Sequence, residues 1–314
     1  MAAPNVAGMT TTDSELVVEA APAVAPDAAP PNAAPPNYLG ILSPSGASDF
    51  MSCPLLYRFR RIDKLPEPAD VAAVRGTLVH TVLERVFDLP APRRIPAEAE
   101  ALLEPALYEM LAAEPEVATL FATADRAEFL SQCRALLASW FTLEDPRRLE
   151  PAERELPVEH LLESGLLLRG ILDRLDVAPT GEVRVVDYKS GRSVSEHFEA
   201  KALFQLRFYA LVLWRTRGVV PTLLQLVYLG NSETISYIPD EADLLATERK
   251  LHALWTAIAR ATETGDWRPH KSALCGWCSH QAICPEYGGT PPPLPNAVAE
   301  LAVATAPATP AAAR

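Results

Sequence analysis

The chain has 314 residues, of which 49% are apolar, so it can bury a sizeable core in one large domain or two small ones. Its formal net charge of −12 excludes binding of nucleic acid through a broad basic face. A local basic groove is still compatible with this net charge. The sequence has no run of 18 apolar residues that would span a membrane and no basic-then-apolar secretory leader, so we expect a cytoplasmic protein.

Proline and alanine are concentrated at both ends of the chain. Thirteen of the 30 prolines lie within residues 1–37 and 291–314, which carry few charges. Segments of this composition bury too little apolar surface to offset the entropy of an ordered chain. We therefore expect two disordered tails, residues 1–37 and 291–314, and one folded domain over residues 38–290.

Helical patterns dominate the first part of the folded region. A serine before an apolar run predicts a short helix within residues 44–60 that carries Cys53. Apolar spacing and a high content of alanine, leucine and glutamate predict further helices over residues 71–88, 97–114 and 123–144. We expect an N-terminal helical region that includes a helical insertion at about residues 90–150.

A basic cluster lies at the end of the first predicted helix. It consists of Arg58, Arg60, Arg61 and Lys64. Tyr57 and Phe59 lie in the same stretch and carry rings on which nucleic-acid bases can stack. Two interpretations have equal weight here: a DNA-binding groove, or a solvated turn beside two core aromatics.

From about residue 152 the pattern changes to strands. Residues 153–161 alternate roughly and contain a proline, which favours an edge strand. Residues 166–177 and 182–189 are β-like and separated by Pro-Thr-Gly, which predicts a hairpin. The remaining elements are two helices over 197–216 and 240–265 and two strands over 222–229 and 233–238, joined through Gly230-Asn231. This order predicts an α/β fold that ends in a cysteine-rich segment.

The predicted hairpin carries the residues that point most directly to chemistry. Asp173 and Asp187 lie on its two strands, so their carboxylates can converge on one hard cation such as Mg²⁺. Lys189 is two residues after Asp187 and projects from the same face of the strand. Such a cation polarises a phosphodiester and activates water, while the lysine stabilises charge or orients the water. From spacing alone, a surface ion pair of Asp173 with Arg174 and an exposed strand end is the simpler explanation, because a single D-x-K in a strand is a weak signal.

Two predicted helices can supply further side chains to this centre. Gln205 and Tyr209 are four residues apart and therefore lie on one face of the helix after the hairpin. His80 follows Arg75-Gly76 on an earlier helix and is a candidate third metal ligand. A single histidine on a helix is more often a core residue, so His80 alone carries little weight.

Four short motifs follow one another along the chain. They are Arg75-Gly76 with His80, Gly170 with Asp173-Arg174, Asp187-Tyr188-Lys189, and Gln205 with Tyr209. In this order they resemble the RecB-like nucleases of the PD-(D/E)XK superfamily, and the resemblance covers about residues 44–287. It implies a restriction-endonuclease-like fold, in which a mixed central sheet is flanked by helices.

The resemblance also implies a metal centre. His80, Asp173 and Asp187 would bind Mg²⁺ or Mn²⁺, and the backbone carbonyl of Tyr188 would complete the shell.

The remaining motif residues would serve the reaction itself. Lys189 would act on the attacking water or the charged phosphate, and Gln205 and Tyr209 would position the lysine and the DNA strand. A further acidic position on the first core strand would fall on Glu153 or Glu155.

Cysteines in a reducing compartment indicate metal ligation or burial rather than disulfides. Cys275 and Cys278 form a C-x2-C knuckle, Cys284 follows, and Cys53 adds a fourth thiolate if the two ends of the domain meet. Four thiolates suit Zn²⁺ or an iron–sulfur cluster, and His280 also allows a zinc site of three cysteines and one histidine.

The resemblance favours iron over zinc. RecB-like nucleases of the AddB type, and related CRISPR-associated nucleases, have one cysteine before the core and three after it, which hold a [4Fe–4S] cluster. In this chain the ligands would be Cys53, Cys275, Cys278 and Cys284, with structural Zn²⁺ as the alternative. Such a staple between residue 53 and residues 275–284 closes a long loop and stabilises the fold. The fifth cysteine, Cys133, is expected to be a buried thiol.

These features predict a DNA exonuclease that hydrolyses single-stranded ends in repair or recombination, with DNA and a helicase or repair protein as its partners. The chain contains no Walker A pattern, so no helicase motor is part of it. A CRISPR-adaptation-type nuclease is one alternative. A non-catalytic DNA-binding or scaffolding subunit is another, and a zinc-ribbon interaction protein leaves the four ordered motifs unexplained.

Overall fold

The computed structural model describes residues 40–121, 124–192 and 196–295, which all belong to one compact unit beginning at Tyr38. The tail predicted over residues 1–37 lies outside the described residues, as does the tail predicted over 291–314 beyond residue 295. Within the described ranges, no helix is both long and apolar enough to cross a membrane.

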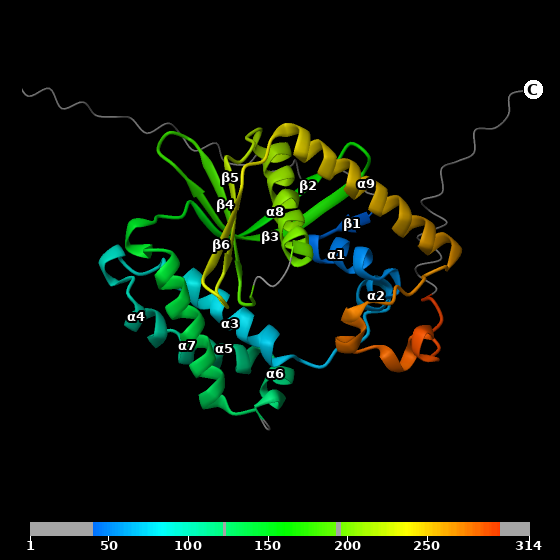
Figure 1. Ribbon diagram of the computed structural model, residues 1–314, viewed down its shortest axis with the longest axis horizontal. Helices are drawn as coiled ribbons and strands as arrows, with labels where there is room; N and C mark the ends of the chain where they lie inside the picture. Colours follow the sequence, from blue (N-terminus) through cyan, green and yellow to red (C-terminus); the bar gives the residue numbers. More distant parts are fainter. Residues whose placement is uncertain (1–39, 122–123, 193–195, 296–314) are drawn as a thin grey trace, which may run out of the picture. The chain divides into compact units, whose positions relative to one another are not determined.

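A mixed sheet of six strands forms the centre of the fold (Figure 1). The strands are β1 (Gly40–Leu42), β2 (Glu153–Leu161), β3 (Leu166–Val177), β4 (Val183–Lys189), β5 (Leu223–Tyr228) and β6 (Glu233–Tyr237). Strand β3 pairs antiparallel with β2 and β4 and parallel with β1, while β4 and β5 run parallel and β5 and β6 antiparallel. The predicted mixed central sheet is confirmed, and Pro157 lies in β2, which pairs with β3 alone among the described strands.

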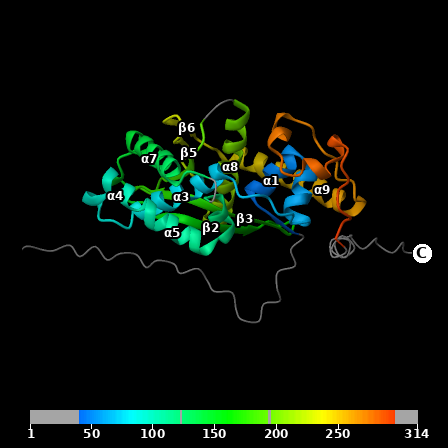
Figure 2. The ribbon, with the colours of Figure 1, turned by 90° about the horizontal axis from the view of Figure 1, so that it is seen from below.

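Helices cover both faces of this sheet (Figures 1 and 2). One layer contains α1 (Pro44–Ser52), α2 (Pro54–Tyr57), α8 (Glu196–Arg217) and α9 (Glu241–Thr264). The other contains α3 (Val71–Val86), α4 (Pro96–Ala101), α5 (Leu103–Ala113), α6 (Pro115–Leu120) and α7 (Arg126–Leu143). Neighbouring residues Val185 and Val186 are both buried, the first in the α8 layer and the second in the α3 layer, because successive side chains of a strand point to opposite faces.

Local sequence signals explain most helix ends. The N-cap side chains of Ser43, Asp70, Asp125 and Asp240 each accept a backbone hydrogen bond at the start of their helices. The helix predicted within residues 44–60 is broken at Cys53, which is extended (φ −164°, ψ 112°) because it precedes Pro54. Strand β1 and helix α6 were not predicted, since both are too short to show a period.

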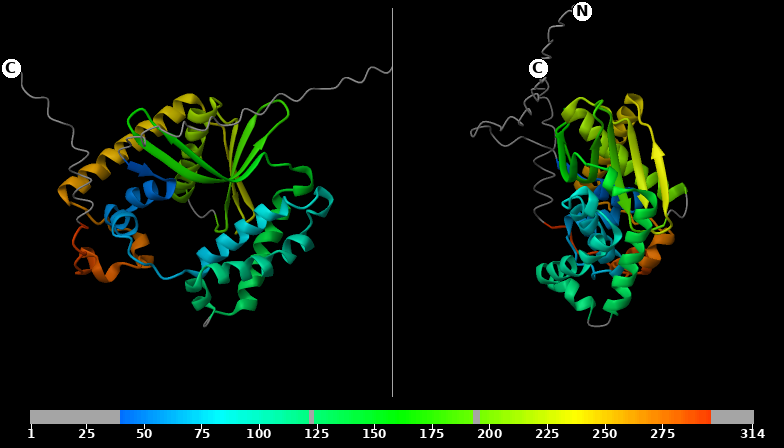
Figure 3. Two further views of the ribbon diagram at one scale, coloured as in Figure 1. Left: turned by 180° about the vertical axis from the view of Figure 1, so that it is seen from behind. Right: turned by 90° about the vertical axis from the view of Figure 1, so that its left-hand side faces the viewer.

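The sheet opens at the middle of β3. Strand β1 pairs with β3 only over residues 166–168, and β4 only over residues 174–177. Residues 169–173 therefore face a gap between β1 and β4, which we term the fork; Figure 3 shows the strands fanning apart here. The alternation of β3 also shifts at this point, because Leu172 packs in the α8 layer whereas Arg174 contacts Tyr188 of the α3 layer.

Between α9 and residue 295, the last described residue, the chain forms only short 3₁₀ turns, at Ala273–Trp277, Gln281–Ile283 and Pro285–Tyr287. We term residues 268–289 the cysteine lobe. It lies beside α1 and α2, as the orange and blue ribbons of Figure 1 show, and the backbone N–H of His270 donates to Cys53 Sγ at 3.3 Å. The two ends of the folded region therefore meet.

Candidate metal and nuclease site

Asp187 is the most deeply buried acid of the fork. It is 1% exposed on β4, and its Oδ1 accepts a hydrogen bond of 2.9 Å from Gln205 Nε2. Its Oδ2 lies 2.6 Å from Lys189 Nζ, yet no described residue donates a hydrogen bond of good geometry to this oxygen. A buried carboxylate oxygen with this coordination has room for one more electropositive partner.

Asp173 points into the gap between β3 and β4. Its Oδ2 accepts the backbone N–H of Tyr188 at 2.8 Å and lies 3.4 Å from His80 Nδ1 on α3. Glu155 of β2 completes the group, since ligand atoms of His80, Glu155 and Asp173 lie within 4.8 Å of one another. Glu155 holds a left-handed backbone (φ +43°), a strained conformation of the kind that persists where function requires it.

The electrostatics of this cluster favour a bound cation. Burial and the nearby Asp187 raise the pKa of Asp173 to about 8, and burial and the charge of Asp173 raise the pKa of Glu155 to about 7. Burial lowers the pKa of His80, so its imidazole is neutral at pH 7 and can bind a metal. In the absence of a cation, protons stabilise these carboxyl groups.

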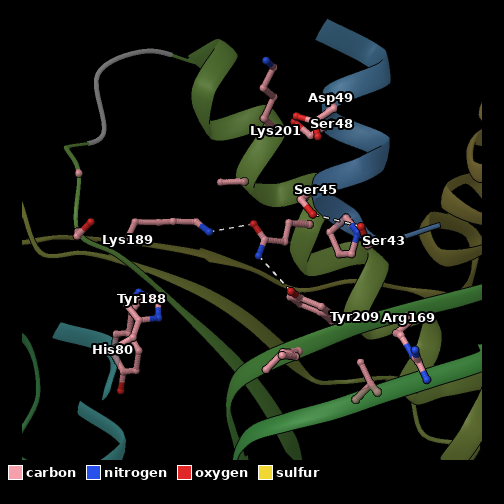
Figure 4. A pocket seen from close by; sticks show the side chains of 18 of the residues that line it. Ser43, Ser45, Ser48, Asp49, His80, Arg169, Tyr188, Lys189, Lys201 and Tyr209 are labelled. Carbon is pink, nitrogen blue, oxygen red and sulfur yellow. Dashed lines mark hydrogen bonds between the residues drawn. The ribbon is translucent and has the colours of Figure 1, made fainter. Parts of the chain in front are cut away.

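Lys189 is fixed from two sides. Its Nζ contacts Asp187 Oδ2 and donates to Gln205 Oε1 at 2.9 Å, and Gln205 in turn lies 3.2 Å from the hydroxyl of Tyr209 (Figure 4). Burial lowers the pKa of Lys189, but the charges of Asp187 and Asp173 outweigh it and the pKa is raised. Lys189 is therefore a held cation rather than a free base. The structure brings together all the side chains predicted to act here: His80, Asp173, Asp187, Lys189, Gln205 and Tyr209.

Two motif glycines lie at close contacts between the elements that carry the site. A Cβ on Gly170 would lie 2.7 Å from the Tyr209 ring, so only glycine lets α8 place that ring across β3. A Cβ on Gly76 would lie 3.1 Å from Ser190 Oγ, so a larger residue at this position of α3 would contact the residue that follows β4. Gly170 is therefore needed for the close approach of α8 to β3, whereas at Gly76 the Ser190 hydroxyl would have to move by only a few tenths of an ångström.

Arg174 turns away from Asp173, so a surface ion pair between them is the wrong interpretation. Arg174 is 1% exposed and donates to both carboxylate oxygens of Glu144, at 2.7 and 2.9 Å. It also donates to the hydroxyl of Tyr188, and Glu144 accepts from Trp140 Nε1 at 2.8 Å. This buried pair joins the end of α7 to both strands of the site. Sequence reasoning missed it because Glu144 lies 30 residues from its partner.

A cleft of about 1380 Å³ opens beside Lys189. Its described lining residues include five cations and two anions: Arg61, Arg169, Lys189, Arg192, Lys201, Asp49 and Glu159. Figure 4 shows Ser45 and Ser48 of α1 and Lys201 of α8 on one side, and Arg169 on the other. The described lining thus carries three more cations than anions, although Arg61 and Arg169 are paired with Asp49 and Glu159 at 3.0 Å.

The predicted basic cluster differs from this groove. Only Arg61 of its members lines the cleft, while Arg58 pairs with Asp63 at 3.0 Å and Arg60 pairs with Asp49 at 2.7 Å. Both aromatic rings beside it, Tyr57 and Phe59, are buried in the core. The two rings are therefore core aromatics and not stacking surfaces, but the predicted solvated turn is wrong, because Arg58–Ile62 is a helical turn in which Arg58 is buried.

Four cysteines surround one cavity of about 320 Å³, namely Cys53, Cys275, Cys278 and Cys284. Burial and the neighbouring thiols raise the pKa of Cys284, in keeping with their proximity. His280 does not join them, because its Nε2 lies 2.8 Å from Glu67 Oε1 and its ring packs on Phe59.

The fifth cysteine is separate from this group. Cys133 is fully buried among the helices of the α3 layer, and burial raises the pKa of its thiol to about 11. The prediction of a buried thiol is confirmed.

Comparison with known proteins adds the family. Among solved structures, similarity is found to a protein from Eubacterium rectale provisionally named an exonuclease (13% identity, 78% of this chain and 88% of that chain, TM-score 0.49). Another is SSO0001 (17% identity, 68% of this chain and 97% of that chain, TM-score 0.35). No curated protein gave a significant match. The family model of the PD-(D/E)XK nuclease superfamily matches residues 41–285, and the chain therefore belongs to this superfamily of phosphodiester hydrolases.

Proposed function

We propose that the chain is an Mg²⁺- or Mn²⁺-dependent DNA exonuclease of the RecB-like type, with its catalytic centre at the fork. The observation that carries the proposal is the unbalanced acidity of this centre. Asp187 is buried and Asp173 is largely buried beside it, and the pKa of Asp173 is raised to about 8 although Lys189 Nζ lies 2.6 Å from Asp187 Oδ2. A divalent cation would relieve this repulsion.

The residues present fit such an ion. Carboxylate oxygens suit Mg²⁺ and Mn²⁺, and Asp173, Asp187 and the neutral imidazole of His80 would hold the metal together with the Tyr188 carbonyl. Glu155 is favoured over Glu153 as the additional acid, because Glu155 lies in the cluster while Glu153 is exposed. The bound ion would polarise the phosphate and lower the pKa of a water.

Lys189 would stabilise negative charge on the phosphate. Its raised pKa keeps the ammonium protonated at pH 7, so it donates hydrogen bonds and does not accept the proton of water. Gln205 holds Lys189 and Asp187 at once, which fixes the ammonium beside the carboxylate. Tyr209 hydrogen bonds with Gln205 and lines the cleft, where it would guide the strand.

We further propose a [4Fe–4S] cluster in the cysteine lobe. The four thiols line one cavity, where they could together hold a metal centre. We favour the cluster over Zn²⁺ because one cysteine before the core and three after it resemble the arrangement in AddB-type nucleases. Backbone N–H groups of His270 and Ser272 donate to Cys53 and Cys275, as is common around such clusters.

The proposed substrate is single-stranded DNA ends, cut during repair or recombination alongside a helicase or repair protein. The basic cleft next to Lys189 supports a nucleic-acid strand as the ligand. The remainder follows from the resemblance of the motifs to RecB-like nucleases.

One assay tests this proposal. Strands labelled at either the 5′ or the 3′ end, single or paired, are incubated with protein and Mg²⁺, Mn²⁺ or EDTA. We expect cation-dependent shortening of the single strand, reduced about 1000-fold or more by Lys189→Ala or Asp187→Ala. Lys250→Ala, on the exposed face of α9, is the matched control and should retain full activity. Binding without cleavage by the wild type would instead identify a non-catalytic subunit.

A further inference from the structure

The basic cleft has one apolar surface beside the catalytic centre. Ile171 of β3 and Pro157 of β2 are direct cross-strand partners, and both line the cleft. Side chains of such partners lie next to each other on one face of a sheet. Ile171 is 55% exposed although it lies at the centre of β3.

The position of this surface relates it to the scissile phosphate. Ile171 is two residues before Asp173, which places it about 7 Å along the strand from a proposed metal ligand. The next pair along the same face is Arg169 with Glu159, an exposed ion pair at 3.0 Å. Ile171 and Pro157 therefore form an apolar step between the metal cluster and a charged pair.

The fork is the reason for the exposure of Ile171. Residues 169–173 lie where neither β1 nor β4 pairs with β3. The adjacent Leu172 is fully buried against the α8 layer, whereas the exposed Ile171 lines the cleft. The strand thus carries an isoleucine that the core of the protein does not use.

We propose that Ile171 and Pro157 form a platform for one unpaired nucleobase adjacent to the cut, an inference that rests on the proposed nuclease function. A nucleotide has an anionic backbone and a flat apolar base, and the cleft offers matching chemistry. Lys189 and Lys201 provide cations for the backbone, and the Ile171–Pro157 step contacts the base. In a duplex the faces of the bases are stacked on one another, so this step selects an unstacked, single-stranded end.

Abasic nucleotides test the platform because they remove a base and leave the backbone intact. The ligands are single strands with one abasic nucleotide at each of the first four positions from either end, plus the intact strand and a duplex. Binding is measured by fluorescence anisotropy with Ca²⁺ in place of Mg²⁺. The proteins are the wild type, Ile171→Ser, and Ile238→Ser as a control, since Ile238 is 74% exposed and lies outside the cleft.

We expect the wild type and the control to lose about fivefold in affinity when the abasic nucleotide occupies one particular position, the low end of the contribution of a stacked base. Ile171→Ser should bind the intact strand about fivefold more weakly and show no further loss at that position. The platform is wrong if Ile171→Ser keeps the same loss, or if the wild type binds a duplex as tightly as a single strand. If the wild type cleaves DNA in Mg²⁺ but responds to no abasic position, only the platform fails; if it neither binds nor cleaves, the proposed function fails as well.

Discussion

The fork and the cysteine lobe are both proposed to hold metal, but protein contacts support them to different degrees. At the fork, Asp187 is buried and held by Gln205, and the strands beneath are joined by Arg174 and Glu144. In residues 268–289, all of them described, only His280 is buried, and Trp277 is 81% exposed. From this difference we expect the fork to be assembled before the proposed cation binds, and the lobe to depend on the proposed cofactor for order.

Removing a sulfur ligand should therefore give the largest structural effect. We expect Cys278→Ser to lose its iron and to become sensitive to proteolysis within residues 268–289, because no core is available there to replace the cluster. Iron content and limited proteolysis measure this. Cys133→Ala is the matched control, since Cys133 lies in the α3 layer and should leave the iron content unchanged. Full iron content in Cys278→Ser would contradict the account, as would stoichiometric zinc without iron in the wild type.

At the fork, the largest loss of stability should come from Glu144. Glu144→Ala removes the bidentate partner of the buried Arg174 guanidinium, which keeps only Asp176 as a described carboxylate partner, at 3.2 Å, so the cost should be about 3 kcal/mol, the low end for a broken buried pair. Denaturant unfolding measures this cost. The double change Glu144→Leu with Arg174→Met should recover most of it, because replacing both charges leaves none unpaired. Equal losses in the single and double variants would mean that the pair does not hold the strands.

Much of the fork was predictable from the sequence, and the reason is local spacing. Asp187 and Lys189 are on one strand, and Gln205 and Tyr209 are on one helix. The repeat of each element, two residues in a strand and about four in a helix, is therefore enough to predict that the members of each pair share a face. The choice between Glu153 and Glu155 was not predictable, because β3 shifts its alternation at Asp173 and Glu155 opposite it has a left-handed backbone.

The basic cleft, in contrast to the fork, was not predictable from the sequence. The cluster at residues 58–64 looks like a DNA site in sequence, but Asp49, Asp63 and Glu67 neutralise much of it. The true lining of the cleft comes from α1, α3, α8 and four strands. Such an assembly depends on tertiary contacts that short-range patterns do not contain.

A smaller expected effect is the pH dependence of stability caused by Asp173, which distinguishes a metal-binding role of this residue from a structural one. The pKa of Asp173 is about 8 in the folded chain against 3.8 unfolded, so the folded state binds an extra proton between these values and loses stability as pH rises through them. Asn cannot ionise. Asp173→Asn without metal should therefore melt several degrees above the wild type at pH 8, since 1 kcal/mol shifts Tm by about 2–4 °C in a domain of this size.

The same variant should lose its response to metal. Excess Mg²⁺ should raise the Tm of the wild type at pH 8 and leave that of Asp173→Asn unchanged. Below pH 4 the two proteins should melt alike, because both side chains are then neutral. A lower Tm for Asp173→Asn at pH 8 would show that Asp173 is a structural acid.

The most direct test is the anomalous scattering of Mn²⁺ in crystals of the full chain. The account predicts a Mn²⁺ peak at the fork, about 2.0–2.2 Å from carboxylate oxygens of Asp173 and Asp187 and close to a ring nitrogen of His80. The same crystals of Asp187→Ala should lack it. A wild-type crystal in saturating Mn²⁺ with no peak between these residues would contradict the claim that the fork is a metal-dependent nuclease centre.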